Sequence, residues 1–112
     1  MNTPELVAAL TDKLGLKLVA YLARSKESHA PREWARGTEV LANAEDIERL
    51  RLALQAANLI TTREPAAIAQ AWFQGLNPVL GDISPARLLR ETDTATAGPE
   101  ILAAARQFVS SQ

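Results

Sequence analysis

Apolar residues recur every three or four positions along most of this chain, which is the spacing of one face of an α-helix. No stretch alternates apolar and polar residues as a half-buried strand does. The pattern predicts helices over about residues 3–14, 17–24, 29–36, 44–60, 65–74, 85–89 and 99–109. The polar residues from Arg90 to Gly98 are typical of a loop before the last helix. We therefore predict an all-α fold.

Local signals indicate where several of these helices begin and end. We expect Thr3, Asn43 and Ser84 to be N-caps, whose side chains accept a hydrogen bond from an amide of the first turn. Gly75 is expected to end the helix over 65–74 by adopting a positive φ. Leu52 lies off the apolar stripe of the longest helix, which indicates that this helix has a second contact surface.

The length of 112 residues supports one compact domain, or two small lobes that share a core. We expect residues 1–62 to form an N-terminal lobe and residues 63–112 a C-terminal lobe. The 47% hydrophobic and 22% charged composition is that of a folded protein. No basic segment followed by an apolar run begins the chain, and no apolar run approaches the ~18 residues of a spanning helix. A cytoplasmic protein without membrane association is expected.

Few residues are suited to catalysis or metal binding. The chain has no Cys and one His, His29, which excludes disulfides and the usual Cys- or His-rich metal sites. Neither a G-x-x-x-x-G-K loop nor a G-x-S-x-G elbow is present. Acidic residues at 45, 46 and 48 are explained by the dipole of the helix that they begin. We expect a binding protein, not an enzyme, and no cofactor.

Charge is distributed unevenly along a chain whose net charge is −1. Residues 13–36 contain six basic and two acidic side chains, and residues 37–64 contain three basic and five acidic ones. Three short helices with a polar turn before the third have the outline of a helix-turn-helix, with Trp34 facing inward. The candidate DNA-binding residues are Lys26, Ser28, His29, Arg32 and Arg36. The alternative is that these side chains are simply solvated.

The C-terminal half contains an ordered set of residues that resembles a known family. Trp72, Asn77-Pro78, Leu80-Gly81, Ser84-Pro85 and Leu88-Leu89 precede Gly98 and a final apolar helix. This order resembles the toxin-binding domain of the MbcA/ParS/Xre antitoxin family over about residues 66–109. The N-terminal half is similar to the degenerate helix-turn-helix of the same family. The signature residues are Trp34, Trp72, Asn77, Leu80, Gly81, Pro85, Leu88 and Leu89.

The resemblance implies an antitoxin of a type II toxin–antitoxin pair. Its partner would be a toxin with the RES fold that depletes NAD, and the antitoxin would bind through its C-terminal domain and occlude the NAD pocket. A homodimer or a toxin–antitoxin hetero-oligomer is implied, as is operator binding by some members through the N-terminal helices. Pro31 departs from the family pattern, because it lies inside the expected recognition helix and proline has no N–H to donate. Base reading by this helix requires that Pro31 fall in its first turn.

Candidate toxin contacts lie near the end of the chain: Arg106, Phe108, Val109 and Ser110. Phe108 and Val109 would be apolar anchors. The alternative for both is the core of the domain, and we expect Trp72 to be a core residue. The alternative function is a DNA-binding repressor whose C-terminal half serves only for dimerisation.

Overall fold

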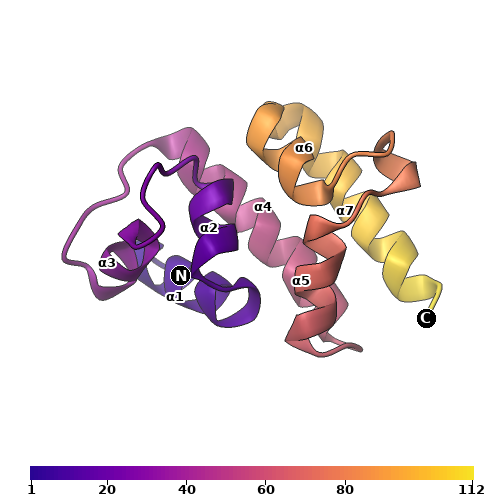
Figure 1. The fold of residues 1–112 in the computed structure, drawn as a ribbon, viewed down its shortest axis with the longest axis horizontal. Coiled ribbons are helices and arrows are strands. Elements are labelled where there is room, and N and C mark those ends of the chain that lie inside the picture. The colour runs from indigo at the N-terminus through magenta and orange to yellow at the C-terminus, as the bar shows by residue number, and fades with distance from the viewer.

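The computed structural model describes all 112 residues and confirms the predicted all-α class. Seven α-helices and one short 3-10 helix follow one another along the chain (Figure 1). Their bounds are α1 Thr3–Leu14, α2 Leu16–Leu22, α3 Ala30–Arg36, α4 Ala44–Thr61, α5 Ala66–Gln74, η1 Pro78–Leu80, α6 Pro85–Glu91 and α7 Thr94–Ser110. None of these helices is both long enough and apolar enough to cross a membrane.

Helix α4 runs through the middle of the molecule, with α1–α3 on one side and α5–α7 on the other (Figure 1). It packs against α1 through one face and against α7 through another. The second contact surface predicted from Leu52 is confirmed, because this side chain is buried against α7 beside Gly98. A single hydrophobic cluster includes residues from all seven α-helices, so residues 1–62 and 63–112 share one core.

The first helix is capped one residue earlier than predicted. Asn2, not Thr3, is the N-cap: its Oδ1 accepts a hydrogen bond from the Glu5 amide at 2.9 Å, and Glu5 Oε1 accepts one from the Asn2 amide at 3.0 Å. This reciprocal capping box requires the acid three residues after the cap, a spacing that only Asn2 has from Glu5. The caps predicted at Asn43 and Ser84 are confirmed.

The prediction for the end of α5 is wrong in its backbone geometry. Gly75 follows the last helical residue, but its φ is −84° and its backbone is extended. After α5 the backbone is extended at Gly75 and at Asn77. The extended conformation lets Asn77 pair with Ile83 across the following turn, where the Asn77 amide donates to the Ile83 carbonyl at 3.0 Å. The left-handed conformation falls later, at Gly81, whose φ is +77°. The reversal of the chain therefore occurs after η1, not at the end of α5.

The predicted loop from Arg90 to Gly98 is also wrong. Helix α6 ends at Glu91 and α7 begins at Thr94, so Pro99 lies inside α7 rather than at its start. Asp93 is the N-cap and accepts hydrogen bonds from the amide and the hydroxyl of Thr96, both at 3.0 Å. Ala97 and Gly98 are buried. Burial of this turn against α4 compensates for the backbone hydrogen bond that proline cannot donate.

Candidate functional site

Trp72 ties the signature stretch of the C-terminal half to the last helix. It is 9% exposed, as expected of a core residue. Its ring meets Phe73 edge-on with centroids 5.1 Å apart, and lies tilted against Phe108 at 6.4 Å. Offset and edge-on aromatic pairs stabilise packing beyond the area that they bury. Trp72 thereby fixes α5 against α7, and the turn that follows α5 rests on this anchor.

Two apolar side chains of that turn are exposed to solvent. Leu76 is 76% exposed and Val79 is 53% exposed. They border a depression of about 310 Å³ between η1 and α7, here named the α5–α7 pocket. None of its lining residues is charged: they are Trp72, Leu76, Asn77, Pro78, Val79, Ala104, Gln107, Phe108 and Ser111. An apolar side chain of a partner is therefore the kind of group that this pocket can accept.

The signature residues form the scaffold that presents this pocket. The Asn77 Oδ1 accepts a hydrogen bond from the Val79 amide at 3.0 Å, which begins η1 and directs Val79 outward. Gly81 ends η1 with its positive φ. Buried or half-buried members complete the scaffold: Leu80, Pro85, Leu88 and Leu89. Trp34, the remaining signature residue, is buried in α3, which packs against α1 and α2 and lies away from this pocket. Leu76 and Val79 lie between the signature residues and were not predicted as contacts. The sequence feature that could have identified them is the presence of two apolar residues in a link that is too short to bury both side chains.

The predicted toxin contacts do not form one surface. Phe108 and Val109 are half-buried and pack against the core, and Phe108 also lines the α5–α7 pocket. Arg106 is exposed and lines a different depression of about 370 Å³ between α4 and α7. Ser110 is exposed and lines neither. Successive residues of a helix point about 100° apart, so residues 106 and 108 face different sides of α7.

All five predicted DNA-binding side chains are exposed. Ser28, His29 and Arg32 line a common depression of about 440 Å³, which Lys26 and Arg36 do not line. Pro31 falls in the first turn of α3, so the helix forms despite it, and Trp34 faces inward as expected. His29 Nε2 lies 3.0 Å from the Glu27 carboxylate, and Arg36 lies 4.0 Å from Glu33.

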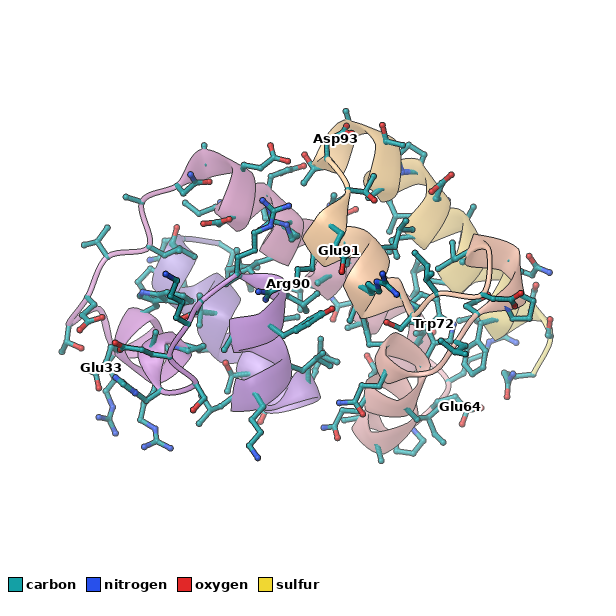
Figure 2. All side chains as sticks on the ribbon, turned by 45° about the horizontal axis from the view of Figure 1, so that its top comes forward. Glu33, Glu64, Trp72, Arg90, Glu91 and Asp93 are labelled. Atoms are coloured by element: carbon teal, nitrogen blue, oxygen red, sulfur yellow. The ribbon has the colours of Figure 1, made fainter.

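The C-terminal end of α2 is held by arginines from both halves of the chain. Arg90 of α6, which is labelled in Figure 2, donates from Nη1 to the Tyr21 carbonyl at 2.6 Å. Its guanidinium lies 4.6 Å from the centroid of the Tyr21 ring. Arg24 donates in return from Nε to the Arg90 carbonyl at 2.7 Å. Arg24 adopts a φ of +60°, which ends α2 at Leu22, earlier than the predicted residue 24.

A buried arginine completes the support of α2 from α4. Arg49 is fully buried, although its position lies off the apolar stripe of α4. Its Nη1 donates to the Leu22 carbonyl at 3.2 Å and to Asp46 Oδ1 at 2.7 Å. Its Nε and Nη2 have no hydrogen-bond partner. Cations at a helix C-terminus are stabilised by the helix dipole, which favours this placement, but the two unpaired donors are costly.

One acidic group has a shifted pKa. Glu45 Oε1 accepts a hydrogen bond from the Thr94 amide at 3.0 Å, where α7 begins. This bond, with a smaller contribution from the positive charge of Arg49, lowers the pKa of Glu45 below its usual value. The group is fully exposed. Its role is to join the first turn of α4 to the first turn of α7, and no group of His, Asp or Glu side chains elsewhere is arranged to hold a metal ion.

Comparison with protein-family models, with curated proteins and with solved structures finds no match to this chain.

Proposed function

We propose that this protein is an antitoxin that binds a RES-fold, NAD-depleting toxin through its C-terminal half and occludes the toxin's NAD pocket. The observation that carries the proposal is the pair of exposed apolar side chains, Leu76 and Val79, at the rim of the uncharged α5–α7 pocket. They lie within the stretch that resembles the toxin-binding domain of the MbcA/ParS/Xre family. Inhibition by occlusion requires no reactive group, only a stable complex.

The exposed pair is suited to a protein interface. Leu76 and Val79 belong to a short ordered turn, and their neighbour Phe108 is held by Trp72. Covering a Leu or Val side chain contributes about 1.5–3 kcal/mol in favourable cases, and little ordering is required here because the turn is already fixed. Arg106 lies on another side of α7, so we assign the first contacts to Leu76, Val79 and Phe108.

The test is co-expression with a RES-type toxin encoded beside this gene, scored by rescue of growth and by co-purification. Leu76→Ser and Val79→Ser are each expected to weaken the complex ~10-fold, since each removes ~1–2 kcal/mol of apolar contact. Val40→Ser is the matched control, because Val40 is 82% exposed in the loop between α3 and α4, at the other end of the molecule (Figure 1). Full rescue by a Leu76→Ser, Val79→Ser double variant with an unchanged melting temperature would refute this surface.

Deletion of the last helix is a poorer test than these substitutions. A chain ending at Ala97 would lose Ile101, Ala104 and Ala105, all of which are buried. Loss of rescue would then report unfolding rather than loss of contact. Leu76 and Val79 are exposed, and substitutions of exposed residues usually change stability by about 0.5 kcal/mol or less.

A second candidate function, operator binding, is favoured by the exposure of all five predicted DNA contacts and by the placement of Pro31 in the first turn of α3. Binding to the promoter upstream of the gene should weaken steeply with salt, because cations are released from DNA as phosphates are contacted. Arg32→Ala combined with Arg36→Ala should abolish it. Retained affinity in that double variant, measured by mobility shift, would refute α3 as the recognition helix.

A further inference from the structure

Two adjoining depressions form a continuous trough along α2. The first, of about 440 Å³, lies against α3, and the second, of about 290 Å³, lies against the start of α6. They share Lys17, Leu18 and Gln74, so one surface runs from the first to the second. We name this surface the α2 trough. Its polar lining residues are Lys17, Tyr21, Ser28, His29, Arg32, Gln74 and Ser84.

The lining of the α2 trough contains no Asp or Glu, although the chain has more acidic than basic residues. Most basic side chains of the protein have a partner: a carboxylate, a hydroxyl or a backbone carbonyl. The basic side chains without one are Lys17, Lys26, Arg32, Arg63 and Arg106, and of these Lys17 and Arg32 line this trough. The nearest carboxylate that an ion pair places beside the lining is that of Glu27, which lies 3.0 Å from His29 and pairs with neither Lys17 nor Arg32. A concave surface with two unpaired cations attracts anions.

The two ends of the trough differ in chemistry. Lys17, Arg32 and the Ser28 hydroxyl supply donors suited to phosphate oxygens at the α3 end. Tyr21 lines the α6 end together with the apolar side chains of Leu18 and Ala86, and the Arg90 guanidinium lies 4.6 Å from the centroid of its ring. The amide of Gln74, which makes no hydrogen bond within the protein, lies where the two depressions meet. We propose that the α2 trough binds a small organic phosphate that also carries a flat ring, with the phosphate at the α3 end and the ring at the α6 end.

The geometry favours a small ligand over the backbone of duplex DNA. The trough is concave and is lined by residues of α2, α3, α5 and α6, whereas a recognition helix has to protrude into a groove. Lys26 and Arg36, which are the outer predicted DNA contacts, line no part of it. Arg32 is common to both surfaces, so a ligand in the trough would occupy a side chain that operator binding also needs.

The test uses the full chain and adenosine monophosphate as the probe, with inorganic phosphate and adenosine as separate arms. Calorimetry should show saturable binding of the monophosphate and weaker binding of inorganic phosphate or of adenosine alone. Amide chemical shifts should change on addition of the monophosphate at Lys17, Arg32 and Gln74. Lys17→Gln and Arg32→Gln should each weaken binding ~10-fold, as loss of one charge-assisted hydrogen bond does. Because neither side chain has a partner in the protein, both variants should keep the parent melting temperature.

Lys26→Gln and Arg36→Gln are the matched controls, since they remove the same charge from the same region outside the trough. They should change the affinity less than ~2-fold, which is the size of a screened long-range effect. Equal weakening by the controls would overturn the proposal in favour of a diffuse basic surface. Absence of saturable binding at millimolar monophosphate would overturn it, as would binding of a random DNA duplex that depends on Lys17 while the monophosphate does not bind.

Discussion

Replacing the buried arginine of α4 with methionine should stabilise the protein. Arg49 keeps two nitrogens, Nε and Nη2, buried without a partner. A buried donor without an acceptor costs about 1–3 kcal/mol, so the two together destabilise the fold by about 2–6 kcal/mol. Arg49→Met removes this cost and fills most of the same volume with an unbranched apolar side chain.

The substitution also removes favourable contacts. The bonds to Asp46 and to the Leu22 carbonyl are lost, and hydrogen bonds to a charged group contribute about 1.5–3 kcal/mol each. Asp46 remains partly exposed and can be hydrated, which limits the loss on that side. We expect a net gain of about 1 kcal/mol in the free energy of unfolding, because Asp46 is left partly exposed and hydrated; removal of one partner is strongly destabilising only when the other charge stays buried and unpaired.

Urea denaturation at neutral pH measures this change directly. The midpoint for Arg49→Met should rise at constant slope, because a stability change without a change in exposed surface alters only the midpoint. Arg49→Ala should destabilise by about 2–4 kcal/mol through the cavity that it leaves. Arg87→Met is the control: Arg87 pairs with Glu91 at 3.1 Å on the surface, and its loss should change stability by at most ~0.5 kcal/mol. An Arg49→Met protein destabilised by more than ~1 kcal/mol would show that the two bonds outweigh the orphaned donors.

Three further predictions concern the ends and the anchor of the fold. Asn2→Ala should lower the free energy of unfolding by ~1 kcal/mol, whereas Thr3→Ala, at the neighbouring position, should lower it less; equal losses in thermal melts would contradict the assignment of the cap. Because the pKa of Glu45 is lowered in the folded state, its stabilisation of the fold is complete above its ordinary pKa of 4.5. This stabilisation is lost as the pH falls through the lower folded value. Glu45→Gln should therefore destabilise the protein at pH 7 and flatten the decline of stability in acid, and an unchanged acid profile would be inconsistent with the bond to the Thr94 amide. Trp72→Ala should destabilise by ~3–5 kcal/mol, and a stable variant that has lost only partner binding would move this side chain from the core to the interface.

The elements that could be predicted from sequence are those governed by neighbouring residues. The N-caps Asn43 and Ser84 act within one turn of chain, and their local chemistry was sufficient to predict them. The start of α7 depends instead on α4, because Glu45 and Leu52 hold its first turns in place. A prolyl residue that marks a helix start in isolation is tolerated inside a helix when distant residues bury that helix.

The candidate sites likewise combine features set by neighbouring residues with features set by residues distant in the sequence. Helical periodicity placed Phe108 on the apolar face of the last helix. It could not show that Leu76 and Val79 would border the same pocket, since their exposure depends on how the turn lies against α7. The α2 trough joins Lys17 to Gln74, which are far apart in the sequence and carry no common motif. Arg49 occupies an ordinary position for a surface charge, and only the packing of α2 over it explains its burial.

The central position of α4 has a consequence for the lifetime of the protein in a cell. Because α4 is packed against α1 and α7 at once, opening of either half exposes buried apolar side chains of α4 and so destabilises the half that remains. We therefore expect a protease that requires an unfolded chain to act mainly on globally unfolded molecules. A partner bound at the α5–α7 pocket would lower the population of the unfolded chain by mass action, and it would thereby protect the α2 trough and α3 from proteolysis as well as the surface that it covers.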